Sequence, residues 1–363
     1  MPSEVHDNKR SSFDIDDQIG KLQNNSLYRD GIHRRTQLQP SMTPLIHEKA
    51  DRLHTICWTP DGDQLLASSS DGNIYFYNFR SDSRLTVNEL WQSQNADHLK
   101  WRPDDRNVFA VGIGRTVKIF DRRKRNKQRP INQFTVKNSD IIDLNWHPNG
   151  QFICAGTKDN RFETFPLKYA VESKPHLFSP IYFNDEINEF KWDYTGRLLL
   201  LTTGLGTILI YDWNEFHNAN KSEDDGFLYS LNVSASNCIC ISCDQQLPRF
   251  AVGCANSLLF LFDIPELICS KTFSTLDYPV RTVNFSSDGA FLASACENRQ
   301  IAIFDVNRDD DCFEVKLDSS SKDQGMPCLS WHPVSPLLAY TANSNESEKD
   351  VMKNIAFWMH KKE

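Results

Sequence analysis

Three cysteines stand close together in the segment CICISC, and their thiol side chains are of the type that binds zinc: Cys238, Cys240 and Cys243. Zinc sites need a second pair of cysteines or histidines at a suitable spacing, and no such pair follows this segment. Cys238 and Cys240 are two residues apart, so in a strand their side chains should point to the same face. The segment is therefore interpreted as a strand with buried cysteines, and no metal or other cofactor is expected.

Two further patterns contain residue types found in catalytic sites. GIGRT, residues 112–116, is like a fragment of a glycine-rich phosphate loop, but it lies between two expected strands and lacks the following helix that would hold a phosphate. His147-Pro148 and His332-Pro333 follow tryptophans at equivalent positions and are interpreted as parts of a repeat. The chain shows no nucleophile elbow and no zinc-protease motif. We therefore expect a protein that is not an enzyme and has no catalytic residues and no small-molecule substrate.

The densest run of charge is DRRKRNKQRP, which begins where an expected strand ends at Asp121. It should form an exposed loop, and like charges this close repel one another unless something neutralises them. Three interpretations remain open: a solvated loop tip, a contact with a phosphate backbone or an acidic partner, and a nuclear-import signal. No aromatic residue interleaves the run, so a base-stacking platform is not expected. The residues of this candidate partner or RNA contact are Arg122, Arg123, Lys124, Arg125, Lys127 and Arg129.

Composition narrows the class of protein. The net charge is −8 and the sequence pI about 5.7, which disfavours a globally basic nucleic-acid binder. No run approaches the roughly 18 apolar residues of a membrane helix, and the N-terminus carries no apolar signal-peptide core. No membrane contact is therefore expected. Most of the ten cysteines lie within apolar runs, which favours reduced, buried thiols in a cytosolic or nuclear protein. The six used for this inference are Cys57, Cys154, Cys238, Cys240, Cys269 and Cys328.

The elements that must position these residues come from an internal repeat. An alternating run ends in an aromatic residue, a polar turn and a second apolar run follow, and a third run closes with an aromatic and often Asp. Seven copies recur about every 45 residues, the spacing of WD40 repeats. Each predicts short strands with period-two alternation. The anchoring positions are Trp58, Trp101, Trp146, Trp192, Phe285 and Trp331, with Cys243 in the fifth copy.

The repeat predicts an all-β fold, a seven-bladed WD40 β-propeller. A four-stranded sheet cannot bury both of its faces alone, so the blades must stack against one another around a ring. Too few residues follow the last strand to complete the seventh blade, and the segment MTPLIHEK around residues 43–48 is the expected donor of its fourth strand. We expect residues 1–40 to be a polar, largely flexible arm and residues 41–363 to be the propeller.

Several segments resemble the WD40 subunits of the THO complex. The similarity is most specific in SNCICI and in DIPELICSKTFSTLDYPVRTVNFSSDGAFLASACE, which includes the link from Leu276 to Arg281. WHPVSPLLAYTA resembles the last blade of that family, and GTKDN and INEFKW match it more loosely. The resemblance extends from the first blade to the C-terminus.

This resemblance implies a non-catalytic scaffold subunit of THO, within the transcription-export (TREX) complex that packages messenger RNA and passes it to nuclear export. It implies a nuclear protein that binds other THO subunits, chiefly the large helical scaffold subunit. RNA contact would then be indirect or weak. Two alternatives stay open: a direct RNA-binding module that uses the basic run, and a WD40 adaptor of another nuclear complex, in chromatin modification or ubiquitin ligation.

Overall fold

The computed structural model describes eleven stretches of the chain: residues 45–46, 53–79, 85–91, 96–124, 126, 128–167, 180–218, 226–308, 312–316, 326–344 and 353–359. Strands dominate them, and the expected all-β propeller fold is confirmed. Residues Gln39–Lys361 form one compact unit. The expected flexible arm of residues 1–40 lies outside the described residues.

The described strands form seven four-stranded sheets, here called sheets 1 to 7. Neighbouring strands within each sheet are antiparallel. In sheets 1 to 6 the strand order follows the chain, from an inner strand to an outer one. Sheet 1 is β2 (Leu53–Trp58), β3 (Gln64–Ser69), β4 (Ile74–Phe79) and β5 (Leu85–Trp91); sheet 2 is β6 (His98–Trp101), β7 (Val108–Ile113), β8 (Thr116–Asp121) and β9 (Asn132–Thr135); sheet 3 is β10 (Ile141–Trp146), β11 (Phe152–Thr157), β12 (Arg161–Pro166) and β13 (Ile181–Tyr182).

The remaining sheets repeat the same plan. Sheet 4 is β14 (Ile187–Trp192), β15 (Leu198–Thr203), β16 (Thr207–Asp212) and β17 (Phe227–Asn232); sheet 5 is β18 (Cys238–Cys243), β19 (Arg249–Cys254), β20 (Leu259–Asp263) and β21 (Ile268–Phe273); sheet 6 is β22 (Val280–Phe285), β23 (Phe291–Cys296), β24 (Gln300–Asp305) and β25 (Cys312–Lys316). Sheet 7 is β26 (Leu329–Trp331), β27 (Leu337–Ser344), β28 (Lys353–Met359) and β1 (Leu45–Ile46). A short helix, α2 (Trp213–Asn218), follows β16.

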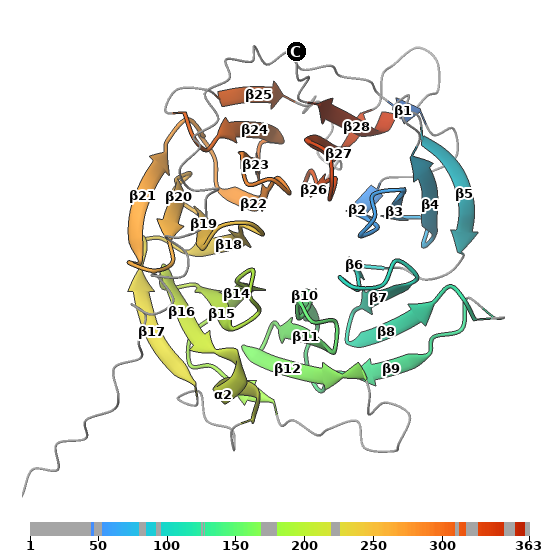
Figure 1. Cartoon of the computed structure of the whole chain (residues 1–363), viewed down its shortest axis with the longest axis horizontal. Helices are drawn as coiled ribbons and strands as arrows, with labels where there is room; N and C mark the ends of the chain where they lie inside the picture. Colours follow the sequence, from blue (N-terminus) through green and yellow to red (C-terminus); the bar gives the residue numbers. More distant parts are fainter. Residues whose placement is uncertain are drawn as a thin grey trace, which may run out of the picture. The chain divides into compact units, whose positions relative to one another are not determined.

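Consecutive sheets pack side by side through their inner strands, and β2 of sheet 1 also contacts β26 and β27 of sheet 7. The sheets therefore follow one another in a cyclic order, with β2, β6, β10, β14, β18, β22 and β26 nearest the centre (Figure 1). The core consists of separate apolar clusters, and most of them draw side chains from two neighbouring sheets, as Phe76 and Phe109 do. This arrangement buries the faces that a single sheet would leave exposed.

Each anchoring position is the last residue of an inner strand, as the repeat predicted. Three of the tryptophans use their indole N–H groups to join neighbouring sheets. Trp58 donates to the carbonyl of Ser330 at 3.0 Å, and Trp146 donates to the carbonyl of Lys100 at 3.0 Å. Trp331 donates to the carbonyl of Asn284 at 2.9 Å. In every case the acceptor is the residue just before the anchor of the preceding sheet.

The two His-Pro pairs also join sheets, which supports their interpretation as repeat architecture. His147 Nε2 lies 2.8 Å from the carbonyl of Gly196, and His332 Nε2 lies 3.1 Å from the carbonyl of Gly62. Both glycines adopt positive φ in the turn of the following sheet, at +74° and +80°. A Cβ at Gly62 would lie 2.3 Å from the His332 ring, so the close approach requires glycine.

In sheet 7, β1 pairs antiparallel with β28, with Leu45 opposite Ile355. β1 falls within the segment that the sequence predicted as the donor of a fourth strand. Only its backbone placement is described, so the closure and the blade count are taken up below as proposals. In the described part of the chain, no helix reaches the length and apolarity needed to cross a bilayer.

Candidate functional site

The basic run lies where it was expected, in the loop between β8 and β9. Arg125 and Lys127 fall outside the described residues. Lys124 and Arg129 are exposed and form no ion pair with a described residue. Because inner-to-outer strands alternate in direction, this loop lies on the same face as the turns that follow the inner strands, such as the turn at Asp105.

Arg122 corrects the expectation that the whole run is an exposed loop. Its side chain is only 14% exposed, and its guanidinium pairs with the Glu89 carboxylate of β5 at 3.2 Å. The same group lies 4.7 Å above the Phe76 ring and donates to the side-chain carbonyl of Gln64. Glu89 also accepts a hydrogen bond from the Trp91 indole. Arg122 therefore joins sheet 2 to sheet 1, and this placement leaves little of it for a partner.

Arg123 is exposed but already neutralised. Its guanidinium pairs with Asp105 at 2.7 Å and with Asp121 at 2.9 Å. Burial acts to raise the pKa of the Asp121 carboxyl, but the hydrogen bonds and charge of Arg123, together with the charge of Lys124, outweigh it, and the pKa is lowered. Of the described basic residues in the run, Lys124 and Arg129 are the ones left for contact with an anionic partner.

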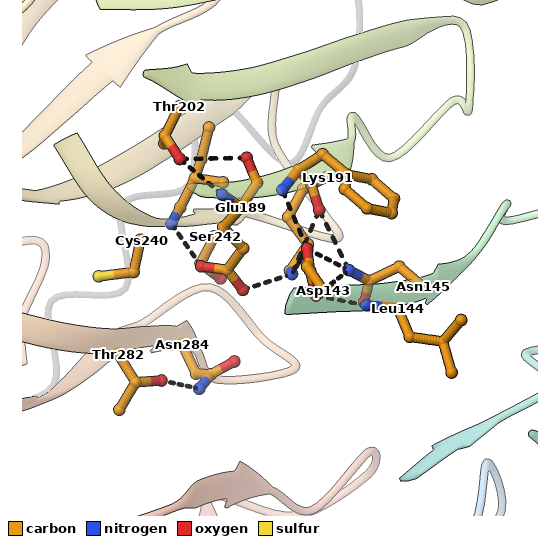
Figure 2. Close-up of polar contacts among 12 residues, drawn as sticks. Asp143, Leu144, Asn145, Glu189, Lys191, Thr202, Cys240, Ser242, Thr282 and Asn284 are labelled. Carbon is orange, nitrogen blue, oxygen red and sulfur yellow. Dashed lines mark hydrogen bonds and ion pairs between the residues drawn. The ribbon is translucent and has the colours of Figure 1, made fainter. Parts of the chain in front are cut away.

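A polar network runs along the inner strands of sheets 3 to 6 (Figure 2). Asp143 Oδ2 accepts the backbone N–H of Phe190 in the next sheet at 3.0 Å. Glu189 repeats this contact with the N–H of Ile241 at 2.9 Å, and Ser242 repeats it with the N–H of Phe285 at 3.1 Å. These side chains come from equivalent strands and hold each sheet to its successor.

The network contains a lysine held between two carboxylates. Lys191 Nζ lies 2.6 Å from Glu189 Oε1 and 3.9 Å from Asp143 Oδ2. Burial alone would lower the pKa of Lys191, but the two carboxylates outweigh it and the pKa is raised. One positive charge lies between two negative charges, and these contacts fasten the inner strands of sheets 3 and 4 together.

The cysteines of CICISC are buried, but one expectation about them was wrong. Cys238 lies 3.7 Å from Cys254 in one apolar cluster, whereas Cys240 packs against Val280 in another. The pairing of β18 with β19 shifts between these two cysteines, and such a bulge turns the following side chain to the opposite face. Among the described residues, no group of three His, Cys, Asp or Glu side chains is arranged to hold a metal ion.

Another exception concerns Cys269, which the sequence placed among buried thiols. It is exposed, because β21 is the outer strand of sheet 5 and its first residues face away from the sheet. Cys57 and Cys328 are partly buried, and Cys154 is fully buried.

The outer strands of sheets 4 and 5 present an apolar surface that the sequence did not single out. On β17, Phe227, Leu228 and Tyr229 are 41%, 42% and 51% exposed. On β21, Ile268 is 59% exposed. Figure 1 shows β17 and β21 as neighbouring strands on the outside of the ring. We call these four residues the apolar rim. The only sequence signal for it is that FLYSLN lacks the polar alternation of a solvated strand.

Comparisons with known proteins agree with this architecture. Residues 268–305 match the model of the WD domain, G-beta repeat, and residues 18–164 match that of the eukaryotic translation initiation factor eIF2A. The β-propeller domain of Myceliophteria thermophila Cps50 (Swd1) superposes with a TM-score of 0.68, covering 89% of this chain and 100% of that one at 14% identity. That likeness shows the fold alone.

Among curated proteins, THO complex subunit 3 of Arabidopsis thaliana is 26% identical over 316 residues, which are 85% of this chain and 91% of the relative. The chain resembles THO complex subunit 3. This confirms the resemblance inferred from the sequence. WD repeat-containing protein AAC3 of Dictyostelium discoideum is also 26% identical, over 82% of this chain and 63% of its own length.

Proposed function

We propose that this protein is a non-catalytic WD40 scaffold subunit of a THO complex. In this role it acts within the transcription-export complex, in messenger RNA packaging and nuclear export, and it resides in the nucleus. Its direct partners are other THO subunits, chiefly the large helical scaffold subunit. It positions these partners by offering a rigid ring of sheets, without chemistry of its own.

The observation that carries the proposal is the extent of the similarity to THO complex subunit 3. The match spans 85% of this chain and 91% of the relative, so it covers the ring as a whole rather than a single repeat. It includes the link with the exposed Tyr278, one of the segments that carried the resemblance in the sequence.

Co-purification from nuclear extract tests the proposal. The full-length tagged chain should bring down other THO subunits, identified by mass spectrometry, and a fluorescent fusion should concentrate in nuclei. Recovery of a chromatin-modifying or ubiquitin-ligase complex without THO subunits would overturn the proposal in favour of the adaptor function.

We propose the apolar rim as the surface for a helical partner subunit. Exposed apolar side chains gathered on one side of a protein mark interaction sites, and a standard interface needs about 800 Å² per partner. The double variant L228S/Y229S should lose THO subunits in co-purification and keep its melting temperature. The variant L205S, which changes a 68% exposed leucine in a turn of sheet 4, is the matched control. Unchanged recovery with L228S/Y229S would place the interface elsewhere.

We further propose that residues 41–363 form a seven-bladed propeller whose last blade is completed by the segment around residues 43–48, and that residues 1–40 are a flexible arm. The pairing of Leu45 and Ile46 with β28 supports this closure. Closing the ring would remove two free sheet edges, which otherwise favour aggregation.

Direct RNA binding through the basic run is the second candidate function. Lys124 and Arg129 favour it, because they are exposed and form no ion pair with a described residue, whereas Arg122 and Arg123 are already paired. Binding of this kind should weaken steeply with salt: on single strands, the logarithm of the binding constant should fall by about 0.7 per neutralised phosphate for each tenfold rise in salt concentration. A double variant K124M/R129M should then lose affinity for an oligouridylate at low salt. No binding by the wild-type chain at low salt would end this candidate.

A further inference from the structure

A cavity of about 340 Å³ lies at the inner edge of the ring, where sheets 7, 1 and 2 meet. Its walls repeat one motif from three sheets: the anchoring tryptophan and the proline two residues after it. The residues are Trp58 and Pro60, Trp101 and Pro103, and Trp331 and Pro333. Val334, beside Pro333, is 73% exposed. The cavity is therefore apolar, lies on the face of the turns after the inner strands, and has an exposed apolar residue next to it.

Lys100 is the one charged residue among those that line the cavity. It is half-buried and forms no ion pair with a described residue. The neighbouring Cys57 does not neutralise it, because burial raises the pKa of that thiol to about 12 and the thiol stays protonated. An anion that entered the cavity would therefore meet an ammonium that no described carboxylate already pairs.

Lys191 shows what the same position looks like when it is satisfied. Lys100 and Lys191 each stand one residue before an anchoring tryptophan. Lys191 is neutralised by Glu189, two residues earlier, and by Asp143 of the preceding sheet. The positions equivalent to these two carboxylates hold His98 and Thr55 in the case of Lys100. Sheet 2 thus has a lysine at the position of Lys191 but lacks the two carboxylates that neutralise Lys191. This lysine, Lys100, lines the cavity.

The Trp101 indole adds an independent observation. Trp101 is 8% exposed, and its Nε1, like that of Trp192, has no hydrogen-bond partner among the described residues, whereas the indoles of Trp58, Trp146 and Trp331 each donate to the preceding sheet. An unpaired buried donor destabilises the folded chain.

We propose that this cavity binds an extended segment of a partner protein through one acidic side chain. The carboxylate pairs with Lys100, and a neighbouring leucine or proline of the segment packs against the more accessible prolines of the wall and against Val334. The inference does not depend on the complex to which the protein belongs.

Charge and burial favour a peptide over RNA as the occupant. A single lysine neutralises one carboxylate, whereas an RNA strand needs a series of cations along its backbone. In the turns of sheets 1 and 2, Arg102 is paired with Asp104 and Arg106 with Asp61 and Asp63, so these arginines are not free to line up along a phosphate backbone. The three tryptophans are at most 8% exposed, so their ring faces are not free for base stacking.

The test compares two blocked peptides on the full-length chain by saturation-transfer NMR titration: acetyl-Pro-Leu-Glu-Pro-amide and its glutamine analogue. A charge-assisted contact of about 1.5–3 kcal/mol predicts at least a tenfold tighter Kd for the glutamate peptide, on the order of millimolar or better. The peptide comparison uses the wild-type chain, so it does not depend on the folding of any variant.

Two variants locate the contact. K100M should bind both peptides with the weaker affinity, while K158M, which removes an exposed lysine of the turn between β11 and β12, should behave like the wild type. Equal affinity for the two peptides, or no binding of the glutamate peptide at millimolar concentration, would overturn the proposal. Displacement of the peptide by an oligouridylate that itself depends on Lys100 would overturn the choice of a protein ligand.

Discussion

At the scale of single residues, the tryptophan indoles show how the repeat joins one sheet to another. Trp146 donates to the Lys100 carbonyl, whereas Trp101 occupies the equivalent position with no acceptor. The sequence predicted both residues as anchors, because their spacing is visible in the chain. It did not predict which indole is paired, because the pairing depends on fractions of an ångström between neighbouring strands.

This difference gives a prediction with a built-in control. Trp146→Phe should lower the free energy of unfolding by about 1 kcal/mol more than Trp101→Phe, since both lose similar ring volume but only the first loses a hydrogen bond. Urea denaturation of the two variants measures the difference. Equal losses would mean that the indole of Trp146 adds nothing to the joint between sheets 2 and 3.

The buried histidines predict a dependence of stability on pH. Burial lowers the pKa of His332 and of His98 below the ordinary value near 6.5. The unfolded chain therefore binds more protons below that value, and the free energy of unfolding should fall as pH drops from 7 to 5. Denaturation across this range should give a shallower slope for H332Q than for the wild type. An unchanged slope would show that His332 does not titrate on unfolding.

At the scale of elements, the strands were predictable and their irregularities were not. Period-two alternation located the inner strands, but it also placed Cys238 and Cys240 on one face, and the bulge between them separates the two. Similar shifts occur near the start of β2, β10, β14 and β22. No fixed residue type marks a bulge in the sequence, because its position depends on how a strand must bend and twist against its neighbours. Likewise, the sequence did not predict the short helix α2 after Asp212, although its Phe216 is buried.

The basic loop shows why charge alone misassigns an element. Arg122→Met should lower the free energy of unfolding by about 2 kcal/mol, because it leaves the half-buried Glu89 without its partner and removes a contact between sheet 2 and sheet 1. Arg129→Met, in the same loop but exposed, should change it by less than about 0.5 kcal/mol. Thermal and urea unfolding provide both values. Similar losses of unfolding free energy for the two substitutions would show that the contacts of Arg122 add no more to stability than those of an exposed loop residue.

At the scale of the whole molecule, the repeat spacing carried most of the prediction. It located the inner strand of every sheet, whereas the segment that pairs with β28 was predicted separately, as the donor of a fourth strand for the last sheet. Repeat spacing did not predict the apolar rim or the cavity, because both depend on which side chains of separate repeats lie next to one another in the folded chain. Lys100 is unremarkable in the sequence, and only comparison with Lys191 in three dimensions shows the missing acids.

Truncation tests the proposed closure of the ring. A chain that lacks residues 1–38 should unfold as cooperatively as the full chain, whereas one that lacks residues 1–48 should lose cooperative unfolding, since β1 can no longer pair with β28. Differential scanning calorimetry distinguishes the two. Equal melting temperatures would refute the role of this segment.

The contact between sheets 7 and 1 has a consequence for the timing of biosynthesis. The Trp58 indole bonds to a carbonyl 272 residues further along, and Gly62 receives His332 across 270 residues. At about 5–20 residues per second, a ribosome needs roughly tens of seconds to supply those partners. During that interval the apolar side of sheet 1 that later packs against sheet 7 is exposed. Because exposed apolar surface promotes aggregation, we expect the nascent chain to need chaperones until its last repeat has been synthesised.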